Sequence, residues 1–260
     1  MTLSLTLVIP CYREANRLRS ERFMKFLDTT EGTRLLFVDD GSPDETPRVL
    51  AALAAQRPGR IDILTLARNV GKGEAVRQGL LNAMAGQTEL VGFWDADLAT
   101  SLELVDAFRE VLTTRSDIHW VFGSRWRGLG RHIHRRASRH YASRVFATVA
   151  SQMLRLAVYD TQCGAKLFRA DDMLRRTLAE PFGARWVFDV EMLARLVAES
   201  RSGLVPPVET LAYELPLSRW VHDGHSHLGW TDFLVAIGDL FMIWVRYLRV
   251  GRASGKVGRE

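Results

Sequence analysis

The chain has 260 residues, of which 47% are hydrophobic and 25% are charged, and its formal net charge is +5. This composition excludes an intrinsically disordered chain, and the length allows one large domain or two small ones. The apolar stretch 233–245 is shorter than the roughly 18 to 20 residues of a membrane-spanning helix, and Asp239 interrupts it. We therefore expect no such helix, and the N-terminus shows no secretory signal. Cys11 and Cys163 match no metal or redox spacing, which predicts reduced, buried thiols.

Short apolar segments of strand length alternate with helical patterns through the first half of the chain. The sequence predicts strands over 5–9, 34–38, 61–66, 89–94 and 119–123. Between these strands it predicts helices over 16–29, 45–56, 72–84 and 101–113. This alternation is typical of an α/β protein with a Rossmann-like, mainly parallel sheet and helices on both faces.

Two of the predicted helices begin with capping motifs. Ser42-Pro43-Asp44-Glu45 has a serine at the cap, a proline at the first helical position and a glutamate three residues after the cap. Thr100-Ser101-Leu102-Glu103 repeats the spacing of a capping box. We therefore predict helices that begin immediately after Ser42 and Thr100.

Polar residues follow every predicted strand, at the edge where sheets of this kind bind ligands. The loops begin PCYRE, DDGS, ARNVGKG, DAD and SR, in chain order. The carboxylates of Asp95 and Asp97 in DAD repel each other, so they need a positive counter-charge. A divalent cation that prefers oxygen ligands, such as Mg²⁺ or Mn²⁺, would supply it. The alternative is a solvated acid pair stabilised by a helix dipole.

Two further loops favour a nucleotide at this edge. Asp39 can accept hydrogen bonds from a base or a ribose, and Gly41 permits a tight turn, although an ordinary turn would use the same residues. Lys72 in GKG lies at a predicted helix start and can contact an anion, but the segment fits neither common nucleotide-binding fingerprint.

The second half of the chain is basic and apolar. Residues 118–159 contain eight arginines and no aspartate or glutamate, and a helix is predicted over 137–157. The arginines form either a solvated face or a site for an anion, and no motif that reads nucleic acid accompanies them, so we expect no nucleic-acid partner. The 137–157 helix and the segment 228–250 either pack in the core or lie at a membrane surface.

Seven motifs in fixed order carry a family resemblance: IPCYRE, VDDGSPDET, RNVGKGEAVRQG, DADLAT, GSR, DTQCGAKLFR and RWVFDVEML. They resemble a family-two glycosyltransferase of the GT-A fold, and the match covers about 5–195. The most similar branch contains the dolichyl-phosphate (polyprenyl-phosphate) glucosyl- and mannosyltransferases. The resemblance implies a nucleoside held by Pro10, Tyr12, Glu14 and Asp39. It also implies that Asp95 contacts ribose and metal, that Asp97 binds Mg²⁺ or Mn²⁺, and that the reaction inverts the anomeric carbon.

The acceptor determines which other residues take part in the reaction. A hydroxyl acceptor needs a general base, for which Asp189 is the first candidate and Asp160 the second. A phosphate monoester, with a second pKa of about 6, is already ionised and needs positive charge instead. The candidates for that charge are Arg125, which we also expect at the reacting centre, Arg136 and Arg139.

The chain departs from the family pattern in its metal ligands. Related lipid-phosphate mannosyltransferases often have a polar ligand two residues after the second aspartate, where this chain has Ala99. Many GT-A enzymes supply a metal ligand from a late histidine. We therefore predict that His225 or His227 completes the metal site, although a solvated loop is the alternative.

We predict one GT-A domain over 1–250, with a nucleotide-sugar half (1–123) and an acceptor and membrane half (124–250), followed by a flexible tail at 251–260. The predicted reaction moves glucose from UDP-glucose to a polyprenyl phosphate, with the enzyme bound peripherally at the cytoplasmic face of the membrane. The alternatives are GDP-mannose as donor, a hydroxyl of a lipid or glycan as acceptor, and a scaffold that binds a nucleotide sugar without catalysis.

Overall fold

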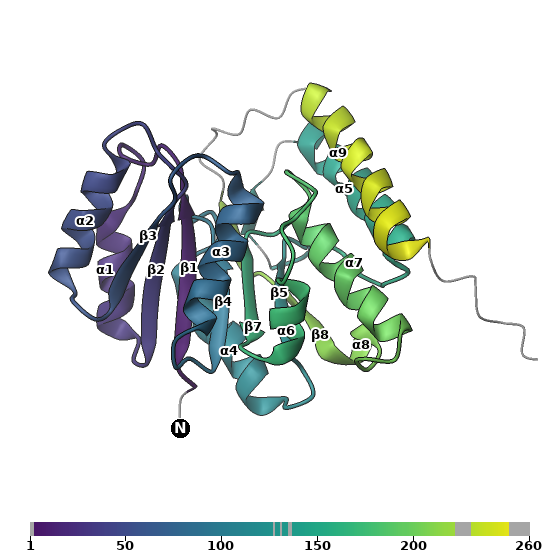
Figure 1. The fold of residues 1–260 in the computed structure, drawn as a ribbon, viewed down its shortest axis with the longest axis horizontal. Coiled ribbons are helices and arrows are strands. Elements are labelled where there is room, and N and C mark those ends of the chain that lie inside the picture. The colour runs from purple at the N-terminus through teal and green to yellow at the C-terminus, as the bar shows by residue number, and fades with distance from the viewer. Residues whose placement is uncertain (1–2, 127, 131, 135–136, 222–229, 250–260) are drawn as a thin grey trace, which may run out of the picture.

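The computed structural model describes residues 3–126, 128–130, 132–134, 137–221 and 230–249 (Figure 1). A seven-stranded sheet occupies the centre in the order β3-β2-β1-β4-β7-β5-β8. Its strands are β1 (Leu5–Cys11), β2 (Thr33–Asp39), β3 (Ile61–Thr65), β4 (Leu90–Trp94), β5 (Trp120–Ser124), β7 (Ala165–Arg169) and β8 (Ala212–Pro216). The five predicted strands are confirmed with ends within two residues, and the predicted α/β class is correct.

Helices cover both faces of this sheet. They are α1 (Ser20–Thr29), α2 (Thr46–Gln56), α3 (Lys72–Met84), α4 (Val105–Thr114), α5 (Ala137–Leu154), α6 (Asp172–Thr177), α7 (Phe188–Arg201), α8 (Val208–Leu211) and α9 (Trp230–Ile243), and the π-helical turn Trp244–Leu248 follows α9. Alternate side chains of β1 enter two hydrophobic cores: Val8 packs with α3 and α7, whereas Leu7 and Ile9 pack with α1, α2 and α4. Cys11 and Cys163 are free and buried, as predicted.

The two predicted helix starts are wrong in detail. Helix α2 begins at Thr46, and the Ser42 hydroxyl instead accepts a hydrogen bond from the Arg13 backbone N–H at 3.1 Å. After Thr100, the short 3₁₀ turn Leu102–Leu104 precedes α4 without a side-chain cap, and the Thr100 hydroxyl instead lies 3.9 Å from Cys163 Sγ. Both segments connect strand-end loops, so tertiary hydrogen bonds replace the local caps.

Strand β7 brings a late part of the chain to the ligand edge of the sheet. It runs antiparallel to both β4 and β5, and Ala165 pairs with Trp94. The amino end of β7 therefore lies beside the carboxyl ends of β4 and β5. The DAD motif after β4 and the DTQCG motif before β7 are therefore neighbours. Separately, the small sheet of β6 (His132–His134) and β9 (Arg219–Val221) pairs a middle segment of the chain with a late one.

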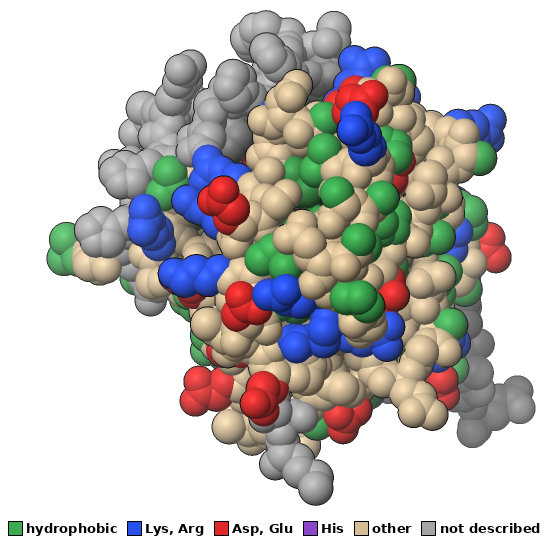
Figure 2. All heavy atoms as spheres, turned by 90° about the vertical axis from the view of Figure 1, so that its left-hand side faces the viewer, with side chains coloured by type: hydrophobic (Ala, Val, Ile, Leu, Met, Phe, Trp, Pro, Cys, Tyr) green, Lys and Arg blue, Asp and Glu red, His purple; other side chains and the backbone are tan. Residues whose placement is uncertain are grey.

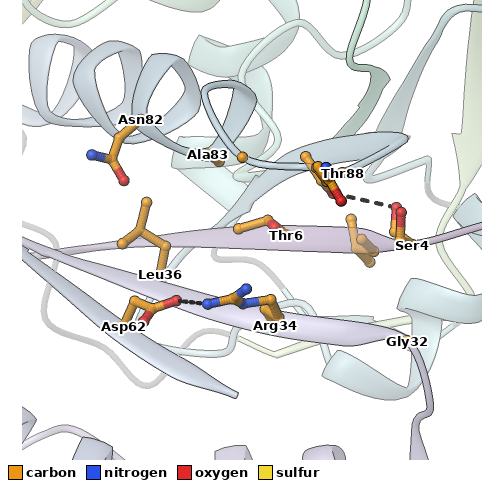
Figure 3. Close-up of a pocket in the computed structure, with 12 residues that line it drawn as sticks. Ser4, Thr6, Gly32, Arg34, Leu36, Asp62, Asn82, Ala83 and Thr88 are labelled. Atoms are coloured by element: carbon orange, nitrogen blue, oxygen red, sulfur yellow. Dashed lines mark hydrogen bonds and ion pairs between the residues drawn. The ribbon is translucent and has the colours of Figure 1, made fainter. Parts of the chain in front are cut away.

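A hollow lies at the opposite, amino-terminal edge of the sheet (Figure 3). Its lining includes Ser4, Arg34 and Thr88, and an Arg34–Asp62 ion pair of 2.7 Å crosses two of its strands. Of the predicted site residues that the structure describes, none lines this hollow. Among the described residues, no helix combines the length and apolarity needed to cross a membrane.

Candidate active site

Asp95 is the first residue after β4, and the segment before β7 fixes its position. Its backbone N–H donates to the Gly164 carbonyl at 2.9 Å. A Cβ at Gly164 would lie 2.0 Å from Asp95 Oδ2. Only glycine leaves room for this carboxylate, so the DTQCG motif forms the wall against which Asp95 packs.

Lys72, the first residue of α3, faces Asp95 across the site. Its Nζ lies 2.6 Å from Asp95 Oδ1, and the two side chains are 46% and 31% exposed. Loss of solvation lowers the pKa of Lys72, but the neighbouring carboxylates, Asp95 first among them, together outweigh this effect and the net pKa is raised. Asp189 and Asp97 act in the same direction as Asp95. The ammonium group therefore lies within a cluster of three carboxylates.

Asp97 lies in a tight turn at the open side of this cluster. Its Oδ1 accepts the Ala99 N–H at 2.9 Å, and Leu98 between them has a φ of 53°. The bulky Leu98 adopts this left-handed backbone while its side chain is buried. Burial raises the pKa of Glu14, the Arg17 ion pair lowers it, and the charge of Asp97 raises it further. The DAD turn and the loop after β1 thus face each other.

The predicted nucleoside residues gather at the ends of β1 and β2. Pro10 ends the apolar part of β1, the exposed Tyr12 follows the strand, and Cys11 pairs with Asp39 in the parallel register. Asp39 is buried, and its Oδ1 accepts the Ser42 N–H at 3.2 Å. The Asp39 side chain therefore helps to hold the turn that follows β2.

The close approach of two loops explains Gly41. Its φ is 62°, and a Cβ there would lie 2.5 Å from the backbone carbon of Arg68. The buried Asp40, to which we assigned no role from the sequence, accepts the N–H groups of Val70 at 2.7 Å and Gly71 at 2.9 Å. Asp40 thereby holds the loop that leads into Lys72. The sequence feature that could have indicated this role is the second aspartate of VDDGS.

Arg125 and Asp160 form a bidentate ion pair behind Asp95. Arg125 Nε and Nη2 lie 2.5 and 2.7 Å from the Asp160 carboxylate, which also accepts the Arg125 backbone N–H at 3.0 Å. The Glu214 carboxylate accepts the N–H groups of Tyr159 and Asp160 at 2.8 and 2.6 Å. Asp160 is thus held from both sides, and Arg125 is fixed at the end of β5.

A second lysine, Lys166 on β7, was not among the predicted site residues. Its Nζ lies 2.6 Å from Asp189 Oδ1 and donates to the Cys163 carbonyl at 2.6 Å. The Lys166 side chain is 1% exposed and lies over the rings of Phe93 and Phe122. Burial raises the pKa of Asp189, although Lys166 opposes that shift. The sequence feature that could have predicted this buried ion pair is a lysine within the apolar strand AKLFR.

Comparison with known proteins identifies the family. Residues 6–175 match the model of the family described as "Glycosyl transferase family 2". The chain belongs to this family. A dolichyl-phosphate beta-glucosyltransferase of Drosophila melanogaster is 31% identical over 269 residues, which cover 95% of this chain and 76% of the relative. The Mus musculus enzyme of the same name is 32% identical over 266 residues, with the same coverage.

Solved structures share the fold of this glycosyltransferase. Glucosyl-3-phosphoglycerate synthase from Mycobacterium tuberculosis, in complex with Mn²⁺, UDP and glucosyl-3-phosphoglycerate, matches with a TM-score of 0.65. Its sequence identity is 17%, and the match covers 94% of this chain and 80% of that one. The predicted family, the α/β GT-A architecture and the enzyme class are confirmed.

Several predicted site residues of the glycosyltransferase fall outside the described residues. Arg136, His225 and His227 do, whereas Arg139 lies on α5. Within the described ranges, no group of three histidine, cysteine, aspartate or glutamate side chains is arranged to hold a metal. Asp95 and Asp97 nevertheless fit a hard cation, because they supply carboxylate oxygens and Asp95 already has a positive charge 2.6 Å away.

Proposed function

We propose that this glycosyltransferase transfers glucose from UDP-glucose to a polyprenyl phosphate with inversion at the anomeric carbon. The observation that carries the proposal is the identity of 29 to 32% with dolichyl-phosphate beta-glucosyltransferases of yeast, fly and mouse over 94 to 95% of the chain. The alternatives from the sequence, GDP-mannose and a hydroxyl acceptor, lack such support from these relatives. The match to the model "Glycosyl transferase family 2" favours an enzyme over a scaffold that binds a nucleotide sugar without catalysis.

In this proposal the donor lies across the ends of β1, β2 and β4. Asp39, Tyr12 and Glu14 surround the nucleoside, and Pro10 and Gly41 shape the two loops that hold it. Asp95 and Asp97 hold Mg²⁺ or Mn²⁺, which stabilises a diphosphate leaving group when bound. Lys72 contributes a further positive charge on the same side, at the beginning of α3.

The ion pairs at the back of the site favour a phosphate acceptor. Asp160 is engaged by Arg125, and Asp189 is engaged by Lys166, so neither candidate base is placed as an isolated carboxylate. A phosphate monoester, with a second pKa of about 6, needs no base at neutral pH. Arg125 binds Asp160 through Nε and Nη2, and we propose that its Nη1 contacts the acceptor phosphate.

The α5 and α9 face supports a peripheral position on the membrane. We define this face by exposed apolar side chains, namely Val145 and Val149 on α5, Ile237 and Phe241 on α9, and Trp244 in the turn after α9. Helices α5 and α9 lie at one end of the molecule and both contact α7 (Figure 1). At the other end, Figure 2 shows charges of both signs scattered among small apolar groups. We propose that the α5 and α9 face rests on the cytoplasmic membrane surface, where the lipid acceptor lies.

A transfer assay tests this function. Purified enzyme is incubated with Mn²⁺, radiolabelled UDP-glucose or GDP-mannose, and either a polyprenyl phosphate or the matching polyprenol in detergent. We expect label in the lipid only with UDP-glucose and the phosphate, and a β-linked product. Transfer to the polyprenol instead would contradict the phosphate acceptor. Transfer from GDP-mannose alone would contradict the donor, and nucleotide binding without transfer would indicate a scaffold.

A further inference from the structure

Lysine is rare in this chain, but two of its lysines lie in the candidate active site. Only four of its 35 basic residues are lysines, namely Lys25, Lys72, Lys166 and Lys256. Two of these four face carboxylates of the site. Arginine binds a carboxylate through a rigid fork, whereas lysine carries a compact charge on a flexible stem. A lysine therefore suits a position where one cation must change partners.

Lys72 has the surroundings for such a change. Its side chain is 46% exposed, and its ion pair with Asp95 lies at the open side of the site. Asp97 and Asp189 also act on its charge, so other carboxylates are near. The ammonium group sits on the carboxylate at which the proposed divalent cation would bind. One carboxylate thus has two candidate cations.

We propose that Lys72 is the counter-ion of Asp95 in the absence of ligands and competes with the divalent cation for this carboxylate. When the cation and the donor bind together, Lys72 moves to the donor diphosphate. The proposal rests on the proposed function, because it requires a nucleoside diphosphate and a divalent cation. Two cations beside one carboxylate repel each other, so free Mn²⁺ binds weakly while Lys72 remains. The diphosphate gives Lys72 a new anionic partner, which couples cation and nucleotide binding.

Binding of Mn²⁺ without catalysis tests the competition. Electron paramagnetic resonance measures free Mn²⁺ in titrations of the wild type, Lys72→Met and Lys25→Met, with and without UDP. Lys25 is an exposed lysine on α1 and serves as the matched control. We expect Lys72→Met to bind Mn²⁺ about tenfold more tightly than the wild type when UDP is absent. We also expect UDP to improve Mn²⁺ affinity less in Lys72→Met than in the wild type.

The variant Lys72→Arg tests whether the mobility of the Lys72 side chain matters in addition to its positive charge. It keeps the positive charge but presents a rigid fork, so we expect Mn²⁺ binding without UDP to be no tighter than in the wild type. Equal Mn²⁺ affinity of Lys72→Met and the wild type, with UDP-dependent Mn²⁺ binding intact, would overturn this inference and leave the proposed function standing. Absence of Mn²⁺ binding by the wild type even with UDP would overturn both.

Discussion

The front and the back of the candidate active site each contain a lysine–aspartate pair with an N–O distance of 2.6 Å. The front pair, Lys72 and Asp95, has side chains that are 46% and 31% exposed. In the back pair, Lys166 and Asp189 are 1% and 9% exposed. Distance alone therefore does not tell what an ion pair does. Exposure separates a pair that can open for a ligand from one that the fold encloses.

The elements that carry each pair account for the difference. Lys166 extends from the middle of the sheet into the core beneath α7, where Phe93 and Phe122 surround its ammonium group. Lys72 begins a helix and Asp95 ends a strand, so their pair lies where loops meet solvent. A buried pair needs additional hydrogen bonds to offset desolvation, and Lys166 donates one to the Cys163 carbonyl.

The largest expected effect is on stability, from Lys166→Met. This change leaves the buried Asp189 without its counter-charge, which costs about 3 to 5 kcal/mol of the free energy of unfolding. Lys72→Met removes a partly exposed pair and should cost less than about 1 kcal/mol. Urea unfolding followed by circular dichroism measures both. Equal losses in the two variants would show that the distinction between an enclosed and an open pair is wrong.

A double variant provides the control for this prediction. In Lys166→Met/Asp189→Leu, apolar side chains replace both charges, so most of the stability lost in Lys166→Met should return. A double variant no more stable than the single one would mean that packing of the lysine stem, rather than the stranded charge, causes the loss.

The second largest effect is expected on catalysis, from Gly164→Ala. Gly164 packs against Asp95 and therefore affects the Lys72–Asp95 pair. The added methyl group occupies the position of the Asp95 carboxylate, so the pair with Lys72 must shift. We expect a loss of about 100-fold in kcat, or about 2.7 kcal/mol, with a smaller loss of stability. Steady-state transfer assays measure it. Gly238→Ala on α9 is the matched control, because its Cβ would meet nothing within 4 Å.

The fold was predictable because hydrophobic periodicity encodes it. The strands and the loops after them follow from local patterns, and so does the placement of Asp39, Asp95 and Asp97 at one edge of the sheet. The capping motifs misled because the hydroxyls of Ser42 and Thr100 contact residues far away in the chain, Arg13 and Cys163, which no local pattern reveals. Local signals therefore predict elements better than they predict the ends of those elements.

The partners of the charged site residues were not predictable from the sequence. The antiparallel insertion of β7 between β4 and β5 brings Lys166 beneath Asp189 and Gly164 against Asp95. Arg125 and Asp160 were proposed separately, and only the fold pairs them. These contacts join residues far apart in the chain, so spacing contains no information about them. Family resemblance located the motifs without telling which charges neutralise each other.

The smallest expected effect is a change of pKa at the open side of the site. Asp97→Asn removes a charge that raises the pKa of Glu14, so that pKa should fall, although burial still raises it. Because the Glu14 pKa lies above its ordinary value in the folded protein, stability decreases as pH rises from that ordinary value to the raised one. Asp97→Asn should reduce this decrease. Carbon-13 NMR titration of labelled glutamate measures the pKa directly.

Asp62→Asn is the control for this titration, because Asp62 lies on β3 beside the hollow at the opposite edge of the sheet (Figure 3). The pKa of Glu14 should not change in that variant. An unchanged pKa in Asp97→Asn as well would mean that Asp97 points away from the loop after β1. The open side would then lack the electrostatic coupling that distinguishes it from the enclosed Lys166–Asp189 pair, and Asp97 would be a weaker candidate to share a cation with Asp95.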